Sequence, residues 1–86
     1  MTMTLRRGVS VTETDYGTTL LDEDSGEYFT LNPSGSLVLR TLLAGGTAAQ
    51  AAQALTDEYA VDGGTADRDV ADLVAELRSA GLVTER

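Results

Sequence analysis

Cysteine, histidine, lysine and tryptophan are all missing from this chain of 86 residues, and proline occurs once. Without cysteine there is no disulfide, no thiolate metal site and no thiol nucleophile. Without histidine the chain lacks the usual proton shuttle and the commonest metal ligand. The carboxylates, hydroxyls and tyrosines that remain do not cluster at spacings that indicate a catalytic site. We therefore expect no enzyme activity, no metal and no cofactor.

Positive charge is scarce as well. Six arginines stand against 14 acidic residues, which gives a formal net charge of −8. A protein this acidic is repelled by phosphate backbones and anionic lipid, and it attracts basic partners. No apolar run approaches the ~18 residues of a membrane span, and the N-terminal residues lack the apolar core of a signal peptide. We expect one cytoplasmic domain, residues 1–86, that binds neither nucleic acid nor membrane.

Three short strands are predicted in the first half of the chain. Residues 8–14 alternate in polarity as a half-buried strand does, and a turn at 15–17 leads into a second strand at 18–21. A tight turn at Ser25-Gly26 precedes a third strand at 27–31, which is rich in aromatic and branched side chains. Successive short strands favour an antiparallel meander, and residues 1–6 are expected to be frayed.

Three helices are predicted in the second half. The first should run from 33 to 44, with Asn32 as N-cap and Pro33 at the first helical position. The second opens with a capping box at Thr47 and Gln50. We expect Thr65 to cap the third, which ends at 80–81. The face of the second helix that should be buried consists of Ala51, Ala52, Leu55 and Tyr59.

The third helix has a central apolar stripe and two flanking shoulders. Val70, Val74 and Leu77 share the centre of the stripe and should face the core. One shoulder consists of Asp69, Asp72, Leu73 and Glu76, and the other of Asp67, Ala71, Ala75 and Arg78. Helices two and three form a helix-turn-helix. The fold class is therefore α+β: a winged-helix-turn-helix-like domain in which a three-stranded antiparallel sheet precedes three helices.

Two short motifs resemble known ligand or attachment sites, but the sequence around each of them argues against that interpretation. Residues 22–27 faintly resemble a calcium loop, but Gly26 stands where a ligand is needed, so a solvated acidic hairpin tip is the better interpretation. Gly35-Ser36-Leu37 resembles the attachment site of acyl-carrier proteins. A carrier needs a helix before that serine, whereas strands are predicted there.

A DNA-binding helix-turn-helix is disfavoured by charge. The third helix would be the recognition helix, and its acidic side chains outnumber Arg68 and Arg78. Recognition helices need positive charge for phosphate contacts and polar side chains for base edges. This helix would repel the duplex.

The edge of the strand at 27–31 is the remaining candidate. An exposed edge presents unpaired N–H and C=O groups that can template an added strand. The alternative is a short, harmless edge blunted by Glu27. The residues alone leave both interpretations open.

The order of several motifs resembles the PqqD-like family. The first is Gly26-x-Tyr28-Phe29-x-Leu31-Asn32-x-x-Gly35 before an apolar helix. The others are Gly46-Thr47, Asp69-Val70 and the ending Leu77-Arg78-x-x-Gly81-Leu82-Val83. The opening Leu5-Arg6-x-Gly8-Val9 is most similar to the stand-alone versions in lasso-peptide clusters. The sequence departs from many relatives at Leu39, where they carry tryptophan.

The resemblance implies a precursor-recognition element for ribosomally made, modified peptides. In that family the leader peptide adds as an antiparallel strand and packs against the third helix, and a separate leader peptidase and macrolactam cyclase act on it. The implied peptide-binding positions are the backbone of Glu27, Tyr28, Phe29, Thr30 and Leu31 and one flank of the third helix. We expect that flank to be the shoulder of Asp69, Asp72, Leu73 and Glu76, because it offers an apolar anchor flanked by carboxylates. The alternatives are a pyrroloquinoline-quinone-type peptide chaperone for a radical-SAM maturase and an acidic winged-helix protein-interaction module.

Overall fold

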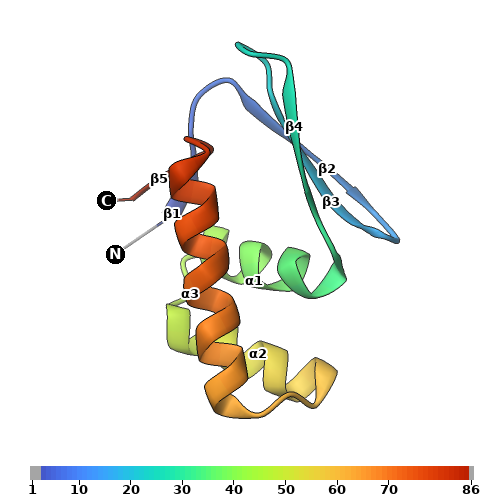
Figure 1. Ribbon diagram of the computed structural model, residues 1–86, viewed down its shortest axis with the longest axis vertical. Coiled ribbons are helices and arrows are strands. Elements are labelled where there is room, and N and C mark those ends of the chain that lie inside the picture. The colour runs from blue at the N-terminus through green and yellow to red at the C-terminus, as the bar shows by residue number, and fades with distance from the viewer. Residues whose placement is uncertain (1–2, 86) are drawn as a thin grey trace.

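The computed structural model describes residues 3–85 (Figure 1). It shows the three predicted strands and the three predicted helices in the expected order, with a further short strand at each end. The strands are β1 (Met3–Leu5), β2 (Val9–Thr14), β3 (Gly17–Asp22), β4 (Glu27–Leu31) and β5 (Val83–Glu85). The helices are α1 (Pro33–Leu43), α2 (Ala48–Tyr59) and α3 (Gly63–Ser79). The α+β prediction, a three-stranded antiparallel sheet followed by three helices, is confirmed.

The main sheet has the strand order β2-β3-β4, so β4 is an edge strand. Both pairings are antiparallel, and Leu20 of β3 lies opposite Phe29 of β4. Leu20 is fully buried, whereas Tyr28 is 70% exposed. Because side chains alternate along a strand, Phe29 and Leu31 share the inner face with Leu20.

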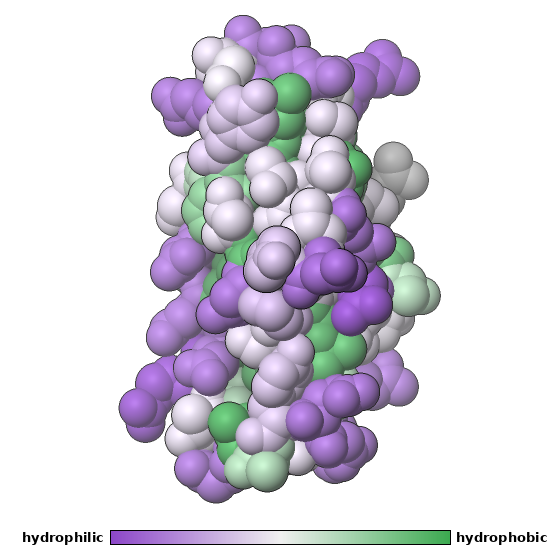
Figure 2. All heavy atoms as spheres, turned by 90° about the vertical axis from the view of Figure 1, so that its right-hand side faces the viewer, coloured by the Kyte–Doolittle hydropathy of each residue, from purple (hydrophilic) through white to green (hydrophobic). Residues whose placement is uncertain are grey.

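The outer face of the sheet carries no charged side chain. By register it consists of Ser10, Thr12, Thr14, Thr19, Leu21, Tyr28 and Thr30. Figure 2 shows pale, weakly polar side chains on the upper part of the corresponding side of the molecule, below its strongly polar tip. The acidic residues therefore gather elsewhere, mainly on helices and turns.

The expectation that residues 1–6 are frayed is wrong for the part that the structure describes. Met3–Leu5 forms β1, which pairs antiparallel with β5, and the hydroxyls of Thr4 and Thr84 lie 2.9 Å apart. Met3 is only 6% exposed. Burial of apolar side chains from both ends of the chain stabilises this two-stranded sheet. Each of its strands is too short to show an alternating pattern in the sequence. Residues 1–2 lie outside the described range.

The helix starts follow the predicted chemistry at two of three places. The side chain of Asn32 accepts from the Gly35 amide, and Thr47 and Gln50 form both bonds of the capping box. Thr65 does not cap α3. Asp62 is the N-cap and accepts from the Thr65 amide, which places both glycines that follow Asp62 inside the helix.

The core lies between the inner face of the sheet and the three helices. Its most completely buried large side chains are Leu20, Val38, Leu39, Val70 and Leu77. Two residues expected in the core are not fully buried: Tyr59 is 46% exposed, and Val74 is only partly buried against the core. Tyr59 is the last residue of α2. No helix within residues 3–85 is both long and apolar enough to cross a membrane.

Candidate functional site

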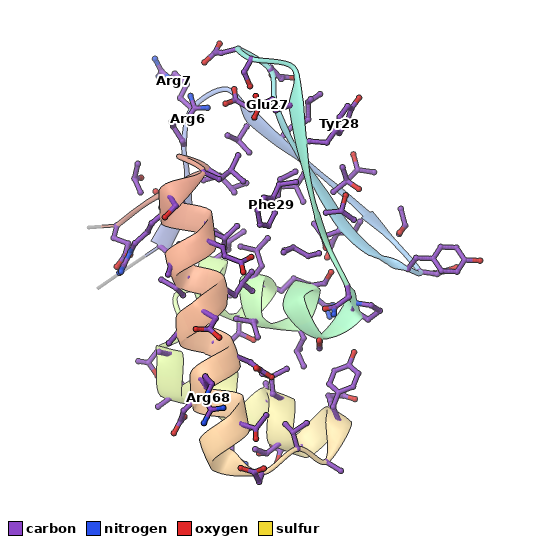
Figure 3. The ribbon with its side chains drawn as sticks, viewed as in Figure 1. Arg6, Arg7, Glu27, Tyr28, Phe29 and Arg68 are labelled. Carbon is purple, nitrogen blue, oxygen red and sulfur yellow. The ribbon has the colours of Figure 1, made fainter. Side chains whose placement is uncertain are left out.

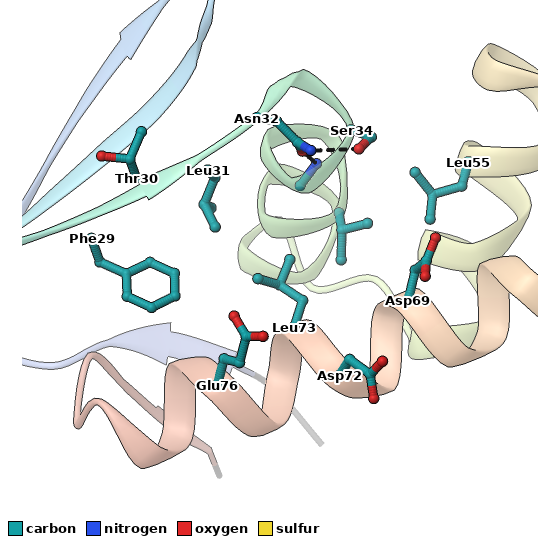
Figure 4. Close-up of a pocket in the computed structure, with 12 residues that line it drawn as sticks. Phe29, Thr30, Leu31, Asn32, Ser34, Leu55, Asp69, Asp72, Leu73 and Glu76 are labelled. Carbon is teal, nitrogen blue, oxygen red and sulfur yellow. Dashed lines mark hydrogen bonds between the residues drawn. The ribbon is translucent and has the colours of Figure 1, made fainter.

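A groove of about 360 Å³ lies between the edge strand β4 and helix α3 (Figure 4). One wall is the second half of β4, and the other is the shoulder of α3 around Leu73. The start of α1 and one residue of α2 form the floor. The lining residues are Phe29, Thr30, Leu31, Asn32, Ser34, Gly35, Val38, Leu55, Asp69, Asp72, Leu73 and Glu76.

The structure brings most of the predicted peptide-binding residues to this groove. It joins Phe29, Thr30 and Leu31 to the complete shoulder of Asp69, Asp72, Leu73 and Glu76. Glu27 and Tyr28 are not among the lining residues. Both are exposed, and Tyr28 belongs to the outer face of the sheet (Figure 3). The helical period separated the two shoulders of α3, and the one preferred for its apolar anchor and carboxylates is the one that lines this groove.

The groove also contains residues that the sequence analysis missed. Asn32, Ser34 and Gly35 come from the first turn of α1, where the Asn32 carboxamide accepts from the Gly35 amide at 2.8 Å and the Ser34 hydroxyl at 2.9 Å. Val38 and Leu55 complete the floor. The short link from β4 into α1 was the available signal, because it forces the start of the helix to lie at the end of the strand.

The pairing register indicates which main-chain groups of β4 face the free edge. A two-residue loop closes the β2–β3 hairpin, so the Gly17 amide points toward β2. Alternate residues of a central antiparallel strand bond to alternate neighbours. Thr18, Leu20 and Asp22 therefore bond to β4, and their partners there are Leu31, Phe29 and Glu27.

It follows that Tyr28 and Thr30 direct their N–H and C=O groups away from β3. These are the groups that an added strand would meet. The side chain of Phe29 points from the same strand into the groove, while that of Tyr28 points to the opposite face of the sheet (Figures 3 and 4). Backbone bonding and side-chain recognition thus use different residues of β4.

The groove has a negative rim around an apolar centre. Asp69, Asp72 and Glu76 are exposed on α3, and Leu73 between them is half-buried. The ion pairs found among residues 3–85 use other carboxylates: Asp22 and Asp24 with Arg6, Glu13 with Arg40, and Glu85 with Arg78. The arrangement suits an extended peptide with an apolar anchor and basic side chains near it.

The two disfavoured ligand sites have structural roles instead. Ser36 is 6% exposed and bonded to Thr18, so its hydroxyl is not available as an attachment point. The Asp22 carboxylate caps the hairpin turn by accepting from the Asp24 and Ser25 amides. Its pKa is lowered, first because the Arg6 guanidinium donates to it and then because of these amides. No group of three or more carboxylates that could hold a metal occurs within residues 3–85.

A second hollow, of about 560 Å³, lies on the other shoulder of α3. Asp67, Ala71, Val74 and Arg78 line it from α3, together with residues of β1, β5 and the α1–α2 junction. Val74, which was expected to face the core, therefore lines a surface hollow. The two shoulders of α3 face different surfaces, and only the one around Leu73 faces the free edge of β4.

Comparison with known proteins identifies the family. A family model described as coenzyme PQQ synthesis protein D, or PqqD, matches residues 17–83, which is most of the chain. The chain belongs to the PqqD family. This match includes β3, β4 and all three helices, so it covers both walls of the groove. The resemblance noted from the sequence motifs is confirmed.

Two solved structures are similar over almost the whole PqqD-family chain. One, described as lasso peptide synthetase B1 complexed with the leader peptide, is 44% identical. The match covers 99% of the present protein and 100% of the synthetase B1 chain, with a TM-score of 0.91. The other, described as TbiB1 in complex with the TbiA(beta) leader peptide, is 28% identical. That match covers 100% of the present protein and 98% of the TbiB1 chain, with a TM-score of 0.85. No curated protein matches the chain.

Proposed function

We propose that this PqqD-family chain is a non-enzymatic adaptor that binds the leader peptide of a lasso-peptide precursor. The leader adds as a strand to the free edge of β4 and places apolar side chains in the groove beside Leu73. The 86 residues act as one cytoplasmic recognition domain without a cofactor, and neither nucleic acid nor membrane is a partner. The bound precursor is delivered to a separate leader peptidase and a separate macrolactam cyclase.

The observation that supports this proposal most directly is the pairing of an open strand edge with an unfilled groove. β4 offers main-chain groups at Tyr28 and Thr30, and Phe29 and Leu73 offer apolar surface beside that edge. Main-chain bonds provide affinity in strand addition, and side-chain pockets provide specificity. The 44% identical structure is described as a complex with a leader peptide, which favours the same type of ligand here.

Calorimetric titration of the purified chain tests the proposal. The probes are the leader peptides of the two similar complexes and the leader segment of any short precursor encoded beside this gene. A scrambled peptide of the same composition is the control. We expect saturable one-to-one binding of a leader and none of the scrambled peptide. A chain that binds none of the leaders would favour an acidic protein-interaction module instead.

Nuclear magnetic resonance locates the bound peptide. The amides of Tyr28 and Thr30 should shift and become protected from exchange, because they gain bonds at the edge. Resonances of Leu73 should move as well. Shifts confined to the second hollow around Ala71 and Val74 would contradict strand addition at β4.

Delivery to enzymes needs a separate assay. Leader cleavage by the associated peptidase, and ring closure by the associated cyclase, should depend on this chain and should rise with its concentration until the precursor is saturated. The family description favours one alternative, a peptide chaperone of pyrroloquinoline-quinone synthesis. That role predicts binding to a radical-SAM maturase and to its peptide substrate, and no effect on lasso-leader cleavage.

A further inference from the structure

Arg6 lies in the short link between β1 and β2 and contacts two separate parts of the molecule. Its Nε donates to the carbonyl oxygen of Gly81 at 2.6 Å. The Nη2 atom lies 2.8 Å from Oδ2 of Asp22, and Nη1 lies 3.2 Å from Oδ2 of Asp24. Gly81 follows the C-terminal end of α3, whereas Asp22 and Asp24 belong to the β3–β4 hairpin. We call this set of contacts the Arg6 clasp.

The two parts joined by the clasp are extensions of the two groove walls. Along the groove, the backbones of β4 and α3 stay apart (Figure 1). At the Leu31 end, β4 is held because Leu31 is 5% exposed and the chain turns at once into α1. At the Glu27 end the hairpin extends beyond the helices, and Arg6 lies between it and the end of α3 (Figure 3).

We propose that Arg6 is a positioning residue that sets the spacing between β4 and α3, and so the width of the leader groove. The role in leader binding rests on the function proposed above; the clasp itself does not. A ligand that bonds to one wall and packs on the other needs both at a fixed separation. A wall that is free to move must be ordered when the ligand binds, which lowers affinity.

The chemistry of the clasp requires arginine. Its planar guanidinium carries five N–H donors in a fixed fork and can reach a carbonyl and two carboxylates at once. A lysine has the same charge but is a compact point charge on a flexible stem. The pKa of Asp22 is lowered and that of Arg6 is raised, first because of the bond between their side chains.

The link remains in place without the Arg6 side chain, so a truncated variant should fold. The Arg6 amide donates to Leu82 O at 2.9 Å, and the Glu23 amide donates to Gly8 O at 2.8 Å. Arg7 supplies a matched control. It is the next residue, its side chain is exposed, and it forms no ion pair with any residue from 3 to 85.

A distance measurement tests the clasp without any ligand. Because the chain has no cysteine, spin labels can be attached at Glu23→Cys in the hairpin loop and Ser79→Cys at the end of α3. Pulsed electron paramagnetic resonance should give one narrow distance distribution in this background. We expect Arg6→Ala and Arg6→Lys to broaden it and Arg7→Ala to leave it unchanged. A distribution that stays narrow in Arg6→Ala overturns the clasp.

Leader affinity tests the positioning role, with the two leader peptides of the similar complexes as probes. We expect Arg6→Ala to weaken binding about tenfold, mainly because the groove is no longer preorganised. Arg6→Lys should not restore affinity, and Arg7→Ala should stay within about twofold of the parent, as expected for an exposed charge. Asp62→Ala, which removes the cap at the far end of α3, controls for stability loss and should leave affinity unchanged below its Tm.

The outcomes separate the two claims. If Arg6→Ala broadens the distance distribution between the spin labels but binds leader at full affinity, Arg6 does not position the groove walls for binding. If Asp62→Ala weakens binding as much as Arg6→Ala does, the effect is general destabilisation and the positioning role is overturned. If the unmodified chain binds none of the leaders used to test the proposed function, that function fails and the role of Arg6 in binding fails with it. The distance distributions still decide whether the clasp exists.

Discussion

The hydroxyl of Thr18 on β3 lies 2.6 Å from the hydroxyl of Ser36 on α1, and both side chains are buried. This bond joins the central strand of the sheet to the first helix, directly behind the point where β4 turns into α1. Each hydroxyl provides a hydrogen-bond partner for the other at a place that is almost completely buried. The bond therefore joins the sheet to the helix whose first turn lines the groove.

Removing one partner of this bond should destabilise the domain. Ser36→Ala leaves the Thr18 hydroxyl buried without a partner, which typically costs about 1–3 kcal/mol. Ser34→Ala is the matched control, because Ser34 lies two residues earlier in the same helix and is only partly buried, and its hydroxyl bonds to the exposed Asn32 side chain. Urea denaturation gives both free energies of unfolding. The double variant Thr18→Val with Ser36→Ala should lose less than the sum of the single losses, and strict additivity would argue against the bond.

The cap of α3 makes a pH-dependent contribution to stability. The pKa of Asp62 is lowered from its ordinary value of 3.8, first by the bond from the Thr65 amide. A carboxyl whose pKa is lower in the folded state stabilises the fold above the unfolded pKa, and this contribution disappears as the pH falls through the folded value.

Asp62→Asn provides the comparison, because asparagine keeps a capping oxygen but does not titrate. The Tm of the parent relative to Asp62→Asn should be highest at neutral pH and should fall between about pH 5 and pH 2. The other shifted carboxyls, Asp22 and Glu85, occur in both proteins, so their effects cancel. A Tm difference that stays constant down to pH 2 would show that the charge of Asp62 contributes nothing to the cap.

Leu73 and Leu77 allow the same substitution to be compared in the groove and in the core. Leu77 is fully buried, and Leu77→Ala should lower the free energy of unfolding by about 2–5 kcal/mol. Leu73 is only half-buried. Leu73→Ala should destabilise the fold less than Leu77→Ala but should weaken leader binding tenfold or more, as truncation of an interface anchor does. Equal losses of stability would place Leu73 in the core instead of the groove.

Local sequence signals predicted most of the fold. The Asn32-Pro33 start of α1 and the Thr47–Gln50 capping box depend on residues close in sequence, and both formed as expected. The β1–β5 pair was missed because its strands have three residues each and lie at opposite ends of the chain. The start of α3 was misplaced because Gly63-Gly64 is typical of a helix break, although the Asp62 cap allows the helix to begin there.

The candidate site was predictable where a single period decides the face. A strand period of two places Phe29 and Leu31 together on one face of β4, and the helical period of 3.6 placed Leu73 on a shoulder of α3. The floor at Val38 and Leu55 depends on how three helices pack, which no local period specifies. Burial of Val74 depends likewise on its neighbours across the α1–α2 junction.

Binding of leader should depend only modestly on salt. Asp69, Asp72 and Glu76 are exposed at the rim, where charge interactions are screened beyond about 8 Å at ~0.15 M salt. Exposed ion pairs contribute roughly 0.2–1 kcal/mol each, so a tenfold rise in salt should weaken binding less than about tenfold. Affinities measured at several salt concentrations check this. Complete loss of binding at high salt would mean that charge, not apolar contact and main-chain bonding, holds the peptide.

Proline substitutions give the sharpest test of strand addition, because proline lacks the N–H that an antiparallel ladder needs. The register assigns the Phe29 amide to β3 and the Thr30 amide to the free edge. Phe29→Pro should therefore break the inner ladder and unfold the sheet. Thr30→Pro should fold, since proline is tolerated on edge strands, but it should remove one of the two amide donors, those of Tyr28 and Thr30, that the edge offers to a leader.

Circular dichroism of both variants reports folding, and calorimetric titration reports binding. We expect a native spectrum and a tenfold or greater loss of leader affinity for Thr30→Pro, since a lost main-chain bond also leaves a leader carbonyl unpaired. Thr30→Ala is the control: it keeps the amide and removes only an exposed side chain, so it should bind nearly as well as the parent. A folded Thr30→Pro variant that binds leader at full affinity would rule out strand addition at β4, and the leader would then have to dock elsewhere.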